Sequence, residues 1–333
     1  MTLRLGFYPY TYARVSVMKS DLIKPAEWHG MLKMGVNELL RMLQDGNYKT
    51  EIDELGADKR DLTSLEIALN NNMMRTLAKL KRISDEKVQE VLNVYVLRYD
   101  MENFKTIIRG KMTGISNEEI EQLLLPSINY SHAFFVDLLK KGSVGEIVQA
   151  LPFEIDERES VQGLDLFEIE NKLDRIYADK LLSLSRRLGG QGKAFKEFLN
   201  AELDALNIKI ILRLKHEGMD KRDIVRYVIY PRAEIAQLIE KQNISEIIDA
   251  LVKMKAIVRS PLEAEQLTQA EISLDTALLK KEVLLMHQFP LTVNVILGFM
   301  FAKEIEVRNL KVLLKGKQLG LEEPYLERLM AVA

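Results

Sequence analysis

Three stretches of the chain show the hydrophobic periodicity of an amphipathic helix. In each, apolar residues stand one, four and five positions after an asparagine. Successive residues of a helix are turned by about 100°, so these positions fall on one side of it. We therefore predict three helices with a buried stripe, formed by Phe104, Ile107 and Ile108, by Ile208, Ile211 and Leu212, and by Leu310, Leu313 and Leu314.

Each stripe is the centre of a longer motif, acid-x-x-Asn-x-Lys-x-aliphatic-aliphatic-base-x-Lys-x-x-Gly. The acids are Asp100, Asp204 and Glu306. The asparagines are Asn103, Asn207 and Asn309, which lie 104 and 102 residues apart (207 − 103 and 309 − 207). Bases follow two and six positions after the asparagine, and this spacing of four places them on one helix face: Lys105 and Arg109, Lys209 and Arg213, Lys311 and Lys315.

A second signature, Glu-x-x-Leu-(Asn/Asp), begins at Glu66, Glu170 and Glu271, and these lie 37, 37 and 38 residues before the asparagines. A weaker third signature, Glu-Ile, recurs at Glu51, Glu146 and Glu246. Signatures in register across three copies indicate an internal repeat of roughly 100 residues, longer than the solenoid period of about 20–50. We predict an all-α fold of three similar helical-bundle lobes, in residues 1–120, 121–225 and 226–333.

Turn residues mark the ends of the predicted helices. A helix over 164–188 should stop at Gly189-Gly190, and the motif helices should stop at Gly114, Gly218 and Gly320, because glycine is common just past a helix end. No alternating run is long enough to predict a strand. The most strand-like stretch, residues 4–17, is predicted to be helix or coil.

Asparagine is unfavourable inside a helix, because its amide competes with the backbone for hydrogen bonds. Its recurrence predicts a fixed hydrogen-bond partner: a hydrogen bond to a neighbouring helix is the favoured interpretation, and a direct contact with a ligand or partner protein is the alternative. The bases form either a solvated face or a patch that meets an acidic partner or the rim of a membrane protein. Both interpretations are open from the residues alone.

Composition narrows the function. The 333 residues contain no cysteine and carry a net charge of −2, so a thiolate site is excluded and nucleic-acid binding is not expected. Glycine and proline together make up about 7.5% of the chain, below the usual level of about 12%. The N-terminus lacks the long apolar core of a signal peptide. The most apolar window, residues 289–302, is too short to span a bilayer.

No catalytic or metal-binding pattern is present in the sequence. The segment Gly189-Gly-Gln-Gly192-Lys193 lacks the first glycine and the Ser/Thr of a phosphate-binding loop, and we predict a turn between helices there. We predict no catalytic residue, cofactor, metal or small-molecule substrate.

The tripled Asp-x-x-Asn-x-Lys motif, clearest at Asp100 and Asp204, resembles the C subunit of archaeal and bacterial V/A-type ATP synthases and the d subunit of vacuolar ATPases. Tyr12-Ala13-Arg14-Val15 is similar to the start of that family's sequences. The resemblance covers essentially the whole chain. The third copy departs from the motif with Glu306 and Lys315, which keep the charge.

This resemblance implies three lobes around a pseudo-threefold axis, arranged as a funnel. It implies a non-catalytic rotor component that lies on the cytoplasmic face of the membrane proteolipid ring and receives the central shaft, the D subunit, with the F subunit nearby. Ion-driven rotation would then become torque for ATP synthesis, or the reverse. Two alternatives are a general helical adaptor for a coiled-coil partner and a helical enzyme with acid/base residues between lobes.

Overall fold

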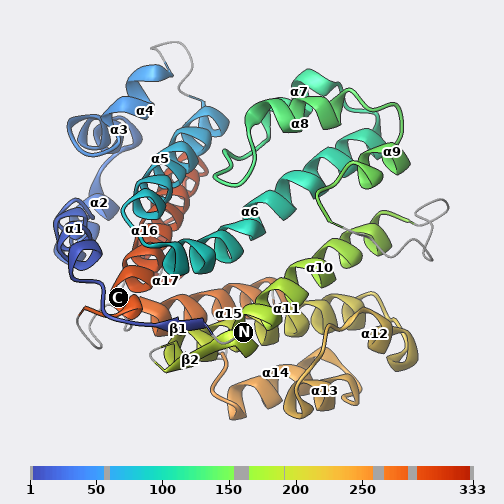
Figure 1. Cartoon of the computed structure of the whole chain (residues 1–333). Helices are drawn as coiled ribbons and strands as arrows, with labels where there is room; N and C mark the ends of the chain where they lie inside the picture. Colours follow the sequence, from blue (N-terminus) through green and yellow to red (C-terminus); the bar gives the residue numbers. More distant parts are fainter. Residues whose placement is uncertain are drawn as a thin grey trace. The chain divides into compact units, whose positions relative to one another are not determined.

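The computed structural model describes residues 3–55, 61–153, 165–190, 192–257, 266–283 and 291–330. Within them, helices joined by turns and loops make up the structure, apart from two strands of three residues each (Figure 1). The predicted all-α class is confirmed. The chain forms two compact units, Met1–Leu62 with Leu188–Ala333, and Thr63–Arg187. The three lobes predicted at 1–120, 121–225 and 226–333 stay a prediction.

The unit Thr63–Arg187 is built around its longest helix, α6. Its helices are α5 (Leu62–Arg82), α6 (Glu86–Thr113), α7 (Asn117–Gln122), α8 (His132–Leu139), α9 (Val144–Gln149) and α10 (Leu166–Arg187). Helix α6 packs against α7, α9 and α10, and α7 packs against α8. The fully buried ring of Phe104 lies within 5.6–6.3 Å of the ring centroids of four aromatic residues, Tyr130, Phe134, Phe135 and Phe153.

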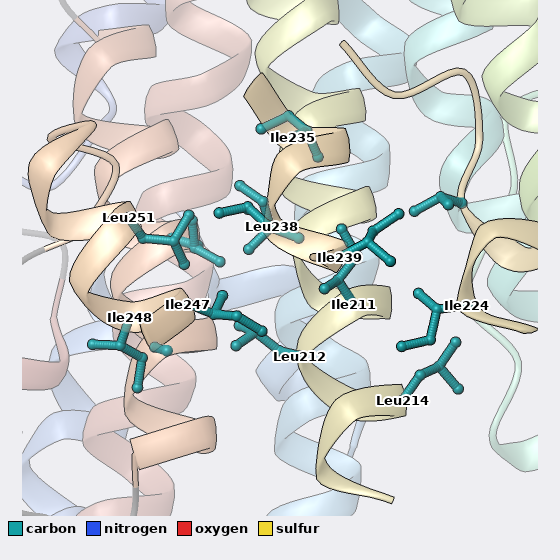
Figure 2. Close-up of a cluster of buried hydrophobic side chains, with 14 of the residues drawn as sticks. Ile211, Leu212, Leu214, Ile224, Ile235, Leu238, Ile239, Ile247, Ile248 and Leu251 are labelled. Carbon is teal, nitrogen blue, oxygen red and sulfur yellow. The ribbon is translucent and has the colours of Figure 1, made fainter. Parts of the chain in front are cut away.

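In the other unit, helix α11 is packed against several short helices and one long helix, as α6 is in the first unit. The helices here are α11 (Lys193–His216), α12 (Lys221–Tyr227), α13 (Ala233–Ile239), α14 (Ile244–Lys253) and α15 (Gln266–Val283). Helix α11 packs against all four of the others. Figure 2 shows Ile211 and Leu212 of α11 facing aliphatic side chains of α13 and α14, and these residues form one buried cluster.

The same unit holds the two ends of the chain. It contains α1 (Pro9–Ser20), α2 (Pro25–Lys33), α3 (Val36–Asp45), α4 (Lys49–Glu54), α16 (Val293–Gln318) and α17 (Glu323–Leu329). Helix α16 packs against α1, α3, α15 and α17, and α17 packs against α2. Helices from the first 55 residues therefore pack against helices from the last 41.

The predicted buried stripes are confirmed. All nine residues of the three predicted stripes are at most 3% exposed. Burial of one large aliphatic side chain contributes about 1.5–3 kcal/mol. These stripes therefore hold α6, α11 and α16 in the interior.

The three motif helices end in the same way, at the predicted glycines. Gly114, Gly218 and Gly320 have φ of +73°, +76° and +69°, in the left-handed region that glycine adopts without strain. In each case the amide of the next residue donates to the carbonyl five residues earlier, at 2.8–3.0 Å. This is the hydrogen bond of a Schellman cap, which closes a helix and turns the chain away from it.

A second glycine position allows close packing of the short helix that follows. Gly110 of α6 and Gly316 of α16 both stand seven positions after the motif asparagine. A Cβ atom at either position would overlap a buried side chain, Ile120 of α7 or Leu326 of α17. The short helices thus lie directly against the backbone of the long ones.

Gly110→Ala is expected to lower the free energy of unfolding by about 1–3 kcal/mol, because the added methyl group overpacks the contact with Ile120. Gly30→Ala in α2 is the matched control, since a Cβ atom added there would meet nothing within 4 Å. That change should be neutral or stabilising by up to about 1 kcal/mol, from the helix propensity of alanine. Chemical denaturation measures both, and equal effects would contradict the close packing.

Two short segments differ from the expectation of helix or coil. Leu3–Leu5 (β1) pairs in parallel with Leu188–Gly190 (β2). The helix-or-coil prediction for Arg4 and Leu5 and the turn prediction for Gly189-Gly190 are therefore corrected to strand. Strands of three residues are too short to show alternation. The remainder of the 4–17 stretch becomes helical at Pro9.

The most apolar window, 289–302, begins with two residues outside the described part of the chain. From Val293 onward it forms the buried start of α16, with Thr292 as the N-terminal cap. In the described ranges, no helix is both long enough and apolar enough to cross a membrane.

Candidate functional site

The repeated asparagines hold a loop peptide against the motif helix. Asn103 Oδ1 accepts from the amide of Leu125 at 2.7 Å, and Asn103 Nδ2 donates to the carbonyl of the same residue at 2.8 Å. Asn207 makes the same two bonds with Ile229, at 2.7 and 2.8 Å. Both partners lie 22 residues downstream. One side chain therefore satisfies both polar groups of a residue between two short helices.

The partner is thus a loop rather than the neighbouring helix that the sequence suggested. A loop peptide has no internal ladder to satisfy its N–H and C=O groups, so a buried one needs a side chain that both donates and accepts. Asn309 is also buried, at 1% exposure. The residue 22 positions after it, 331, lies outside the described residues.

The motif acids bind the segments that lead into the next short helix. Asp100 accepts from Asn129 Nδ2 at 2.8 Å, three residues before α8. Asp204 accepts from the guanidinium of Arg232, the N-terminal cap residue of α13. Burial raises the pKa of both carboxyl groups. Hydrogen bonds from Ser127 and Asn129 partly offset the rise for Asp100, and the hydrogen bonds from Arg232 partly offset it for Asp204.

In the third copy the longer acid, Glu306, binds three groups. Its Oε1 accepts from Tyr48 Oη at 2.6 Å and from Lys303 Nζ at 2.7 Å, and its Oε2 accepts from the amide of Ile23 at 2.6 Å. Lys303 and Glu306 are 4% and 3% exposed. The extra methylene of glutamate lets one carboxylate join α16 to two N-terminal segments, which accounts for the departure from aspartate.

The bases of the first two copies are paired inside the chain. Lys105 Nζ lies 2.6 Å from Asp174, and Arg109 binds both oxygens of Glu170. In the next copy, Lys209 Nζ lies 2.5 Å from Asp275, and the guanidinium of Arg213 contacts both oxygens of Glu271 at 2.6 and 3.0 Å. In the third copy, Lys311 is half-buried and makes a noncovalent contact within the chain, whereas Lys315 is exposed.

These acids belong to the second sequence signature. The bases on α6 meet Glu170 and Asp174 of α10, and those on α11 meet Glu271 and Asp275 of α15. The motif of one copy therefore binds the signature of the next copy along the chain. This pairing explains why the two patterns recur at a fixed spacing.

The Lys105–Asp174 pair gives a test that depends on pH. Burial raises the pKa of Asp174, and Lys105 partly offsets that rise. Lys105→Met should raise this pKa further and destabilise the chain by about 1–3 kcal/mol at pH 7. The pKa of an aspartate in the unfolded chain is near 3.9. A group whose pKa is higher than this in the folded state destabilises the folded state at pH values above 3.9, where the unfolded chain loses the proton more readily. The loss should therefore shrink as the pH falls from 7 toward 4.

Thermal unfolding of Lys105→Met and the unmodified chain at pH 7 and pH 5 measures this change. Lys140→Met is the matched control, because Lys140 and its partner Asp137 are 69% and 70% exposed. That change should cost less than about 0.5 kcal/mol at either pH. A Lys105→Met penalty that grows as the pH falls would contradict the assigned role.

The sequence did not predict several of these hydrogen-bond and ion-pair partners. Asn129, Arg232, Tyr48 and Lys303 carry no repeated pattern, so nothing singled them out. The glycines at 110 and 316 did leave a signal, since both occupy the unassigned position between the last two bases of the motif.

Comparison with known proteins identifies the family. The family model described as ATP synthase (C/AC39) subunit matches residues 11–329. The chain belongs to this family. It is 30% identical to the C subunit of the A-type ATP synthase of Archaeoglobus fulgidus, over 98% of this chain and 96% of that protein. It is 29% identical to the C subunit of the A-type ATP synthase of Methanococcoides burtonii, over 98% and 94%.

Membership of the C/AC39 family agrees with the resemblance drawn from the motifs. It assigns the chain to a family of accessory subunits whose processes are ATP synthesis and ion transport. The match includes all three motif helices, α6, α11 and α16, and the second-signature helices, α5, α10 and α15. The ion pairs described above therefore lie within the matched residues.

Proposed function

We propose that this chain is the rotor component that joins the membrane proteolipid ring to the central shaft, the D subunit, with the F subunit nearby. The observation that carries the proposal is the family match over residues 11–329. In this role the chain is peripheral, on the cytoplasmic face of the membrane, and transmits torque without binding nucleotide. The funnel arrangement implied by the resemblance stays a prediction.

The packing of the long helices supports a torque-bearing role. A torque-bearing part must resist sliding of one helix along another. Two ion pairs four residues apart join α6 to α10, and two more join α11 to α15. The two ion pairs hold each pair of long helices in register at two points one turn apart, and a slip of one helical turn would leave one base and one acid of each set without a partner.

Purification of the tagged chain from solubilised membranes tests the proposed assembly. The proteolipid ring and the D and F subunits should co-purify with it. A general helical adaptor would instead bring down a coiled-coil partner without the ring. A chain recovered alone from membranes that contain an intact complex would contradict the proposal.

Among the repeated bases, we assign an interface role to Lys315. Reversing the charge of Lys105 or Lys209 would break an internal ion pair and confuse folding with binding. Lys315 is exposed, so Lys315→Glu changes the surface. It should lower the yield of ring and shaft in the same purification. Lys140→Glu, also on an exposed side chain, is the control, and equal yields from both variants would remove Lys315 from the interface.

A further inference from the structure

The three motif helices receive their flanking helices from different parts of the chain. Helices α6 and α11 are each flanked by the short helices that follow them in sequence, α7 to α9 and α12 to α14, with α8 reaching α6 through ring contacts to Phe104. Helix α16 is followed by α17, the last element of the described chain. Helices α1 and α3, from the N-terminal segment, also pack against α16.

Helix α4 corresponds to α9 and α14 in sequence. The Glu-Ile signature places its glutamate at the third position of each of these helices. The following isoleucines, Ile52, Ile147 and Ile247, are at most 2% exposed. By this sequence register, the N-terminal pair α3 and α4, of which α3 packs on α16 and α4 packs on α3, corresponds to α8 and α9 and to α13 and α14 beside the other two motif helices.

Polar contacts between this N-terminal segment and α16 converge on one carboxylate. Glu306 accepts from the amide of Ile23 and from Tyr48 Oη, at 2.6 Å each. Lys303 Nζ also donates to Tyr48 Oη at 2.9 Å and lies over its ring. Further along α16, Lys317 Nζ donates to the carbonyl of Leu32 at 2.5 Å.

We propose that residues 3–55 act as a clasp that closes the third helical bundle, with Tyr48 and Glu306 as its latch. The helices of the clasp pack on α16 and α17, and its strand β1 pairs with β2. The cluster around α11 and the aromatic cluster around Phe104 contain no residue of the segment 3–55 among those described. The clasp therefore opens as one cooperative unit while α6 and α11 stay packed, in the manner of a sub-global opening.

The chain has a built-in reporter for this opening. Its one tryptophan, Trp28, lies in α2 and is 6% exposed.

Tyr48→Phe removes the hydroxyl bound to Glu306 and keeps the ring over Lys303. A hydrogen bond to a charged group is worth a change of about 10- to 100-fold in an equilibrium constant. The clasp of the full-length variant should open more often by that factor.

Hydrogen exchange and urea unfolding test the clasp. In Tyr48→Phe, amides of α1 to α4 should exchange about 10- to 100-fold faster, with those of α6 and α11 unchanged. The fluorescence transition of Trp28 should move to lower urea while the main circular-dichroism transition stays in place. Tyr10→Phe, at an exposed residue of the same segment, should alter neither. Equal acceleration in α6 and α11, or no acceleration in α1 to α4, would overturn the proposal.

Discussion

Glu306→Leu is expected to lower the free energy of unfolding by about 3–5 kcal/mol, the largest effect among the single substitutions considered. The change removes the carboxylate that binds Lys303, Tyr48 and the amide of Ile23. Lys303, at 4% exposure, would lose its carboxylate counter-charge and keep the neutral Tyr48 hydroxyl, and removing one partner of a buried ion pair is strongly destabilising. Calorimetry and urea unfolding measure the loss.

A second substitution separates the ion pair from the packing. Removing both charges with Lys303→Met and Glu306→Leu should restore part of the lost stability, because no uncompensated charge is left buried. The matched surface control is Lys221→Met with Glu240→Leu, an exposed pair whose removal should leave the free energy of unfolding almost unchanged. If the double variant lost as much unfolding free energy as the sum of the losses of Glu306→Leu and Lys303→Met, the two residues would not be energetically coupled, and this result would contradict a buried ion pair.

Asn207→Leu is expected to cost about 2–4 kcal/mol. Asn207 is fully buried, and its side chain satisfies both the N–H and the C=O of Ile229, which is also fully buried. Leucine is similar in size and can make neither hydrogen bond. Two backbone groups would lose their partner, and each unsatisfied buried group costs about 1–3 kcal/mol. The midpoint of thermal unfolding should fall accordingly.

Gln237→Leu is the matched control for this amide-to-leucine exchange. Gln237 lies on α13 in the same unit and is exposed, so its replacement should change stability by less than about 0.5 kcal/mol. Asn103→Leu should reproduce the Asn207→Leu loss through Leu125. An Asn207→Leu variant that melts with the unmodified chain would contradict the buried clamp.

The sequence predicted what depends on local and repeated patterns. Apolar spacing identified the buried stripes of α6, α11 and α16, and the glycines at 114, 218 and 320 marked where these helices end. Three copies of one motif made each prediction stronger than a single match, because the same error would have to occur three times.

The sequence could not predict contacts that occur once and join distant segments. Tyr48 and Lys303 are bound through Glu306, yet neither repeats in the other copies, and Tyr48 lies 258 residues from Glu306. The bases were assigned to a solvated face or an external partner because periodicity shows which side of a helix is polar and not what it meets. The parallel pairing of Leu3–Leu5 was missed because it depends on backbone hydrogen bonds to residues 188–190.

The rotor assignment is tested most directly by watching the chain turn in the assembled complex. The chain contains no cysteine, so Lys140→Cys on an exposed side chain gives one labelling position without a competing thiol. With the catalytic head of the complex fixed to a surface and a probe on that position, ATP should drive stepwise rotation in one direction. A probe on the D subunit of the shaft serves as the positive control. Rotation of that control while the probe on this chain stays still would contradict the proposed coupling role.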